Sequence, residues 1–284
     1  MEVRRLVPGD EARLSAFLAA HADSSMFLRS NLRAGGLADA GQPYQGTYVG
    51  AVEGDRIHAT VALNWNGLLV LQAPVHLGPL LDRLQQEATR PITGLAGPLG
   101  QVADARRLLG RGDAEIRKDS REDLFALPLD RLVVPAPLAE GIWVSRPPSA
   151  DEFQTLFAWR LASVIETSAA ECSASTRTDA EETIRRQAGN GMLFVLEAEG
   201  RPVSMSSYNA RIPDMVQIGG VFTPHELRGR FYARACVAGS LRAARDAGVS
   251  RSVLFTPKDN ASAQAAYRAI GFQVVGEYGL TVFK

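Results

Sequence analysis

The sequence contains little cysteine and almost no lysine. Cys172 and Cys236 are the only cysteines among 284 residues, which excludes a disulfide framework and a multi-cysteine metal site. Lys118, Lys258 and Lys284 are the only lysines, so arginine carries nearly all of the positive charge. The formal net charge is zero, because the 31 basic residues are equal in number to the 31 acidic ones. The chain therefore lacks the basic footprint that binding to nucleic acid requires.

Long apolar runs are also missing. No uncharged run reaches the length of a membrane span, and the first residues lack the apolar core of a signal peptide. We therefore expect a cytoplasmic protein without a membrane partner. The sequence has no Walker lysine, no HExxH motif and no paired cysteine cluster, so metal and nucleoside-triphosphate chemistry are not expected. The hydrophobic fraction of 46% suits two cores, and the length favours two domains.

The most informative stretch runs from Val216 to Phe272. It predicts, in order, a strand at 216–223, a turn at 224–230, a helix at 231–247, a strand at 252–256 and a helix at 261–270. The segment 228–233, with two arginines, lies where the turn becomes the helix. Helix N-termini have unpaired N–H groups and a partial positive charge, so such a junction binds anions. A phosphate-bearing cofactor is therefore expected.

Two motifs in this stretch resemble the GNAT superfamily of acyl-CoA-dependent N-acyltransferases. The segment Arg228-Gly-Arg-Phe-Tyr-Ala233 is similar to the pyrophosphate loop Arg/Gln-x-x-Gly-x-Gly/Ala, with Phe231 in place of the middle glycine. The spacing of Asn260, Tyr267 and Gly271-Phe272 is similar to the second family element. The resemblance covers residues 141–284 and extends to the first half only in the order of elements.

The resemblance implies acetyl-CoA as the acyl donor and assigns roles to residues. Those expected to bind the cofactor are Val221, Phe222, Thr223, Arg228, Gly229, Arg230, Phe231, Tyr232, Ala233 and Asn260. Tyr267 is expected to act as the general acid that protonates the leaving thiolate. Each assignment has a structural alternative: Gly219-Gly220 as a plain bulge, Asn260 as a helix cap, and Tyr267 as a core residue.

The general base is less clearly marked. Glu166, Glu171, His225 and Glu226 are the candidates, and an ordered water chain is an alternative to any single side chain. We take Glu166 as the candidate catalytic base. No metal ligand is expected.

The predicted fold class is α/β (α+β), with two tandem GNAT-like domains, each a mostly antiparallel twisted sheet flanked by helices. Residues 1–135 form the first domain and 141–284 the second, separated by the prolines of 135–137. The segment 143–152 echoes 3–11, which suggests two copies of one fold. The first copy has no loop motif near 74–78, so we expect it to be degenerate and to bind no cofactor of its own.

The predicted function is N-acetyl transfer from acetyl-CoA to a primary amine of a small-molecule or peptide acceptor. The alternatives are a non-catalytic acyl-CoA-binding or regulatory protein, and an aminoacyl or mycothiol-synthase-like transferase. The identity of the acceptor and a homodimeric state are left open by the sequence.

Overall fold

The computed structural model describes residues 1–168 and 171–284. The chain divides into two compact units, each of which draws on more than one stretch of sequence. Unit 1 comprises Met1–Leu124, Phe255–Asp259 and Val274–Lys284, and unit 2 comprises Phe125–Leu254 and Asn260–Gln273. The boundary expected at 135–141 stays a prediction.

The sheet of unit 1 has the strand order β1-β2-β3-β4-β5-β12. Its strands are β1 (Glu2–Arg5), β2 (Gly46–Glu53), β3 (Arg56–Asn64), β4 (Leu68–Gln72), β5 (Gly94–Pro98) and β12 (Gln273–Phe283). Neighbouring strands are antiparallel except β4 and β5, which run parallel. The strand at the end of the chain pairs with β5, from Tyr278 opposite Pro98 to Val282 opposite Gly94.

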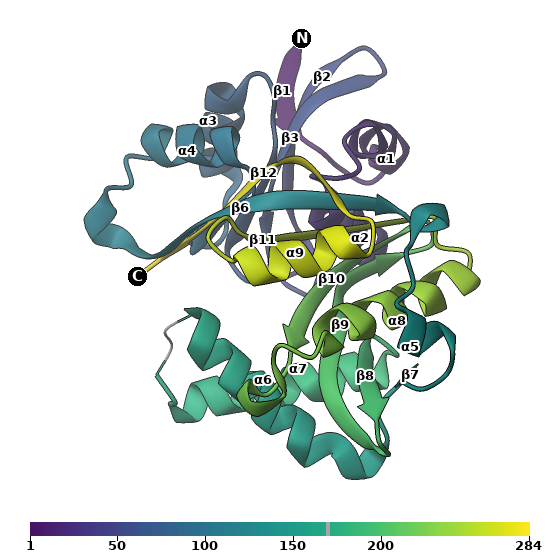
Figure 1. The fold of residues 1–284 in the computed structure, drawn as a ribbon. Helices are drawn as coiled ribbons and strands as arrows, with labels where there is room; N and C mark the ends of the chain where they lie inside the picture. Colours follow the sequence, from purple (N-terminus) through teal and green to yellow (C-terminus); the bar gives the residue numbers. More distant parts are fainter. Residues whose placement is uncertain (169–170) are drawn as a thin grey trace. The chain divides into compact units, whose positions relative to one another are not determined.

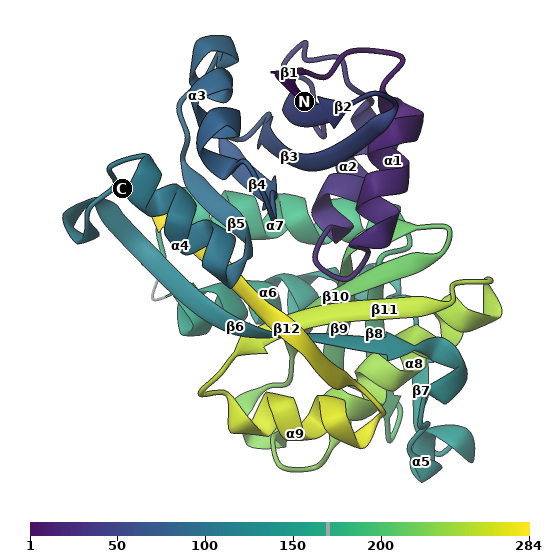
Figure 2. The same ribbon diagram turned by 90° about the horizontal axis from the view of Figure 1, so that it is seen from above.

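Helices cover both faces of this sheet. In Figure 2, α1 (Glu11–Ala20) and α2 (Met26–Gly35) lie on one side of the strands, and α3 (Leu77–Glu87) and α4 (Leu99–Leu108) lie on the other. The spacing of Leu80, Leu81 and Leu84 places all three on the buried side of α3, where they join the core with the strands.

The sheet of unit 2 contains the strands β11-β10-β9-β8-β7 in that order. They are β7 (Val144–Arg146), β8 (Leu193–Ala198), β9 (Arg201–Ile212), β10 (Met215–Phe222) and β11 (Arg251–Pro257). Only β10 and β11 are parallel neighbours. Strand β11 and the long strand β6 (Ile116–Pro128) each have residues in both units.

Two cores flank the sheet of unit 2. On one face α6 (Phe153–Ser168) and α7 (Ala174–Gly189) bury a small cluster, and on the other α8 (Tyr232–Asp246) buries a larger one. Figure 1 shows these helices on opposite sides of β8, β9 and β10. The remaining helices are α5 (Ala136–Ala139), α9 (Ala261–Ala269) and the 3-10 turns Asp113–Glu115, Leu129–Arg131, Ala150–Glu152 and His225–Leu227. None of the described helices is long and apolar enough to cross a membrane.

The same order of elements occurs twice along the chain. Each copy has a strand, two helices, three antiparallel strands, a helix, a parallel strand and a further helix. The predicted mixed α/β fold with mostly antiparallel sheets is therefore confirmed. Several predicted element ends were wrong by one residue. Helix α8 spans Tyr232–Asp246 rather than 231–247, and β10 spans Met215–Phe222 rather than 216–223. The prolines of 135–137 lead into the short helix α5.

A matching ion pair opens each copy. Arg4 donates two hydrogen bonds to Asp10, and Arg146 donates two to Glu152, all between 2.7 and 2.8 Å. In both copies the carboxylate also accepts a backbone N–H from the residue three positions before it. The arginine and these hydrogen bonds lower the pKa of Glu152 to about 2, despite its burial. The ion pair thus fixes the first strand to the start of the first helix.

We predict that Glu152→Gln lowers the free energy of unfolding at pH 7 by about 2 kcal/mol. The folded-state pKa lies below that of the unfolded chain, so this contribution is complete above about pH 4.5 and disappears as the pH falls toward about 2. Urea denaturation of both proteins across this range measures the difference. Glu199→Gln serves as the control, because that carboxylate is exposed and 3.8 Å from its arginine. A pH-independent difference would contradict the prediction.

Candidate functional site

Strands β10 and β11 of the unit 2 sheet separate partway along β10. They pair at Met215 with Arg251, at Val216 with Ser252 and at Gln217 with Val253. Strand β10 continues to Phe222, but no further pairing with β11 is present among the described residues. The second half of β10 therefore offers backbone polar groups that its parallel neighbour does not use.

Two glycines shape this free edge. The pairing of β10 with β9 is irregular between Gly219 and Phe222, and Gly220 has a φ of +57°. A Cβ atom on either glycine would collide with a polar side chain of β9, Asn209 at Gly219 and Ser207 at Gly220. The bulge considered for Gly219-Gly220 is thus confirmed, and it bends β10 away from a regular ladder.

The predicted residues Val221, Phe222 and Thr223 lie at the end of β10. Phe222 and Thr223 are mostly buried, and Ser204 on β9 donates a hydrogen bond to the Phe222 carbonyl at 2.9 Å. The Thr223 hydroxyl is 2.9 Å from that of Ser204. These side chains are therefore engaged inside the protein, and Val221 is the half-exposed member of the three.

The turn between β10 and α8 contains two left-handed residues. Gly229 has a φ of +77° and Phe231 a φ of +66°. Phe231 thus adopts the backbone conformation that the family's glycine would favour, although the left-handed region costs an L-residue about 1 kcal/mol. Phe231 is 61% exposed, and the Arg234 guanidinium lies over its ring, 4.1 Å from the ring centroid. The backbone at this position therefore has a positive φ although the residue is phenylalanine and not glycine.

A run of unpaired donors follows this turn. Among the described residues, no protein acceptor is found for the backbone N–H groups from Gly229 to Arg234, and the first helical bond runs from Ala235 to the Phe231 carbonyl at 3.3 Å. Consecutive N–H groups at left-handed turns and helix N-termini form a concave anion site. The Tyr232 side chain packs on Trp143 in the core, so Tyr232 offers this site only its backbone.

The side chain of Arg228 is exposed and is bound by two neighbouring groups of the protein. Its Nε donates to the Thr223 carbonyl at 3.0 Å, and its two terminal nitrogens donate to Glu166 at 2.9 and 2.6 Å. This pairing lowers the pKa of the Glu166 carboxyl and raises that of Arg228. The structure thus brings the candidate base and the first residue of the loop motif together in one ion pair. Arg230 is exposed beside them.

Helix α9 carries the second motif. The Asn260 side chain accepts a hydrogen bond from the Ala263 N–H at 3.1 Å, so its predicted capping role is confirmed. Gly271 has a φ of +106°, and the Phe272 N–H donates to the Tyr267 carbonyl at 3.2 Å, which closes the helix. The half-buried Tyr267 ring packs edge-on against Phe125 and Phe272. Tyr267 and Val221 border the same core cluster.

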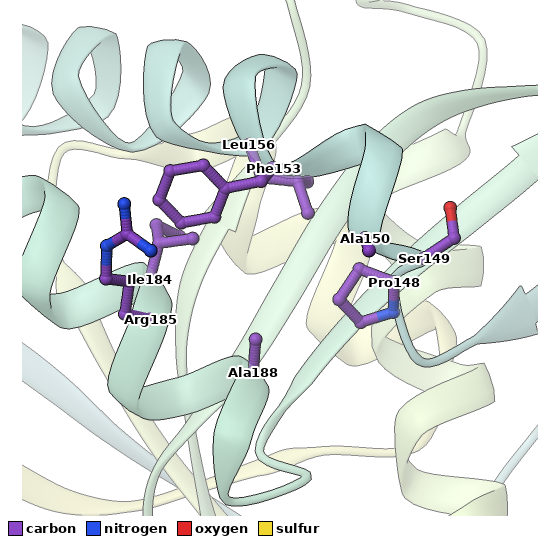
Figure 3. Close-up of a pocket in the computed structure, with 8 residues that line it drawn as sticks. All are labelled: Pro148, Ser149, Ala150, Phe153, Leu156, Ile184, Arg185 and Ala188. Atoms are coloured by element: carbon purple, nitrogen blue, oxygen red, sulfur yellow. The ribbon is translucent and has the colours of Figure 1, made fainter.

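A cavity of about 400 Å³ lies elsewhere in unit 2, between the start of α6 and the end of α7. Figure 3 shows the Phe153 ring and Arg185 near one end and Pro148 near the other. The Arg185 guanidinium makes two contacts: it lies 4.4 Å from the Phe153 ring centroid and forms an ion pair with Glu181. No predicted site residue lines this cavity.

Sequence reasoning missed two polar residues next to the point where β10 and β11 separate. Ser207 donates to the Gly219 carbonyl at 3.1 Å, and Gln217 is buried on β10 just before the strands separate. The signal was present in the sequence, because Gln217 is a single amide in an otherwise apolar strand. Glu171 and Glu226, named as alternative bases, are exposed.

The chain is similar to known protein families and solved structures. Residues 159–272 match the model described as the acetyltransferase (GNAT) family. A Drosophila protein of known structure superposes with a TM-score of 0.69 at 14% identity, covering 99% of this chain and 98% of that one. A tandem GNAT protein from the clavulanic acid biosynthesis pathway gives 0.56 at 15% identity, covering 100% and 98%.

A third structure, a GCN5-related N-acetyltransferase from Sphaerobacter thermophilus, gives a TM-score of 0.56 at 18% identity and covers 99% and 94% of the two chains. No curated protein matches the sequence. At these sequence identities, the three structural matches show a shared fold only. The family match is a match of sequence, and the matched residues include the loop at 228–233 and the motif on α9. Residues 159–272 therefore match the GNAT acetyltransferase family, and the chain shares its fold with a tandem GNAT protein over its whole length.

Proposed function

We propose that this protein transfers an acetyl group from acetyl-CoA to a primary amine of a small-molecule or peptide acceptor. The observation that carries the proposal is the run of six N–H groups from Gly229 to Arg234, at the start of α8, that have no protein acceptor among the described residues. Such a run suits a diphosphate, because several fixed donors and the helix dipole act on one anionic group. The free edge of β10 lies immediately before it in the chain.

The residues present fit coenzyme A in two ways. The N–H groups of 229–234 and the exposed Arg230 would hold the diphosphate, and the unpaired edge of β10 around Val221 would hold the pantetheine amides. Phe222, Thr223 and Tyr232 would contribute through their backbones. Acetyl-CoA supplies a thioester, and transfer forms one C–N bond to the amine while one C–S bond breaks.

Two residues would carry out the proton transfers, one as general acid and one as general base. Tyr267 would donate its hydroxyl proton to the departing sulfur, since a phenol is a weak acid that can protonate a thiolate. Glu166 would accept the proton that the amine loses. Its pairing with Arg228 lowers its pKa, so it is ionised at neutral pH but weakly basic, and a water chain between it and the amine would serve the same end.

Direct transfer is favoured over a route through an acylated cysteine. Cys236 lies fully buried in α8, and burial raises the pKa of its thiol to about 12. A thiol of that kind supplies almost no thiolate at neutral pH. Within the described residues the other cysteine, Cys172, is exposed between α6 and α7, outside the two motifs.

The first copy would bind no cofactor. Its corresponding turn, from Ala73 to His76, is short, and Pro74 and Pro79 remove two of the N–H donors that the second copy has. The Ala73 N–H at the end of β4 is already bound by the Gln101 side chain at 2.7 Å. The first copy therefore has fewer backbone N–H donors for a diphosphate and pantetheine than the second copy has. One of those donors, the Ala73 N–H, is already hydrogen-bonded to Gln101.

Calorimetric titration with acetyl-CoA, followed by an amine screen that measures release of free CoA thiol, tests the proposal. We expect one site per chain with a dissociation constant on the order of micromolar. The screen pairs amines that differ by a single group, such as glycinamide and ethylamine, and includes a dipeptide. Absence of acetyl-CoA binding would contradict the proposal, and binding without transfer to any amine would favour the non-catalytic alternative.

We predict that Tyr267→Phe lowers kcat by about 10²-fold or more while the dissociation constant of acetyl-CoA stays unchanged. The phenyl ring keeps the packing on Phe125 and Phe272, so only the hydroxyl is lost. Steady-state kinetics and calorimetry on the same preparation separate the two effects. Tyr44→Phe is the control, because Tyr44 lies in unit 1 and stacks on Trp65. Full turnover in Tyr267→Phe would remove the acid from the mechanism.

We predict opposite effects for two substitutions of Phe231. Phe231→Gly keeps both the left-handed φ and the N–H, so the dissociation constant of acetyl-CoA should stay within about threefold of that of the wild type. Phe231→Pro fixes φ near −65° and removes the N–H, so binding should weaken more than about tenfold. Equal losses in both variants would instead mean that the phenyl ring itself contacts the cofactor.

A further inference from the structure

One buried amide in unit 2 has a donor without a partner. Gln217 is 1% exposed, and its side-chain Nε2 has no hydrogen-bond partner among the described residues. An unpaired buried donor loses its hydration without compensation, so such groups are uncommon in folded proteins. Gln217 is also the last residue of β10 that pairs with β11. The unpaired donor therefore lies where the two strands begin to separate.

The neighbours of Gln217 determine which face it occupies. Val216 and Ile218 both belong to the core cluster that α8 covers, so the side chain between them points to the opposite face. That face also holds Asn209, whose side chain takes the space where a Cβ on Gly219 would be. The face of the sheet away from α8 thus carries two amide side chains, Gln217 and Asn209, next to the bulge in β10.

The corresponding strand of the first copy provides a contrast. Gln72 ends β4 and is equally buried, at 3% exposure, but its Oε1 accepts hydrogen bonds from Ser24 at 2.8 Å and from Ser25 at 3.1 Å. Gln72 is therefore held by its own unit. The fold can satisfy a buried glutamine on this strand, and the second copy leaves one with an unused donor.

We propose that Gln217 binds the acceptor and donates a hydrogen bond from Nε2 to an oxygen atom close to the reacting amine. The ligand class that fits is an amine with a carbonyl or carboxylate oxygen one or two carbons away, as in an amino acid, an amino amide or a peptide N-terminus. This inference rests on the proposed acyl transfer and narrows its acceptor. A site that hydrogen-bonds such an oxygen discriminates against amines that lack it, since the buried donor would then stay unpaired.

The first test is thermal unfolding of two matched variants. Gln217→Met removes an unpaired donor at constant volume, so its melting temperature should rise by about 2–4 °C. Gln72→Met removes the acceptor of two serine hydroxyls, one of them fully buried, so its melting temperature should fall. A fall in both variants would mean that the protein itself satisfies Gln217, which would overturn the inference.

The second test compares glycinamide with ethylamine as acceptors at saturating acetyl-CoA. The wild type should prefer glycinamide more strongly than Gln217→Met does, by about tenfold in the ratio of kcat/KM, which is the effect of about one hydrogen bond. Comparing the ratio between variants cancels the difference in basicity of the two amines. The dissociation constant of acetyl-CoA should be equal in both proteins, which a disturbed fold would not produce.

An unchanged glycinamide-to-ethylamine ratio in Gln217→Met would overturn the inference while leaving acyl transfer intact. Failure of the proposed function has a different signature, because the wild type would then bind no acetyl-CoA or transfer to no amine. In that case the acceptor role of Gln217 is rejected together with the transfer, whatever the melting temperatures show.

Discussion

The separation of β10 from β11 after Gln217 is the constraint on which the rest of the site depends. Two parallel strands inside a sheet normally satisfy each other's backbone groups along their length, and here they stop doing so after three residue pairs. The bulge at Gly219-Gly220 redirects β10. Because β10 then enters the turn that starts α8, the unused edge of the strand and the unpaired N–H groups of the helix follow one another directly.

The two copies of the fold differ in what binds the backbone groups beyond the end of the parallel strand pair. In the first copy β4 and β5 also pair in parallel over a short stretch, from Leu68–Gly94 to Val70–Ala96. Beyond it, Gln101 from α4 reaches back and binds the Ala73 N–H. A side chain of the protein thus satisfies this backbone donor. Under the proposed function, the duplicated architecture would therefore not imply duplicated binding, because each copy must still leave its donors unused.

The sequence predicted what is encoded locally. The Asn260 cap and the bulge at Gly219-Gly220 each depend on residues within one turn or strand, and the structure contains both. It did not predict that the C-terminal strand joins β5 of the first unit, because strand pairing at long range leaves no periodic signal. Nor did it place the Arg228 side chain on Glu166, since that pair spans a helix and a loop distant in sequence.

Phe231 illustrates why a motif should be interpreted as a set of backbone conformations rather than of residues. The loop pattern that this chain resembles has glycine there, a residue that adopts positive φ without strain, and this chain has a phenylalanine at +66°. The cost of about 1 kcal/mol is offset in part by the stacking of Arg234 on the exposed ring. Strain of this kind persists only where the surrounding structure imposes it. Here the end of β10 and the start of α8 fix both ends of the turn, so the N–H groups keep their arrangement although the glycine is gone.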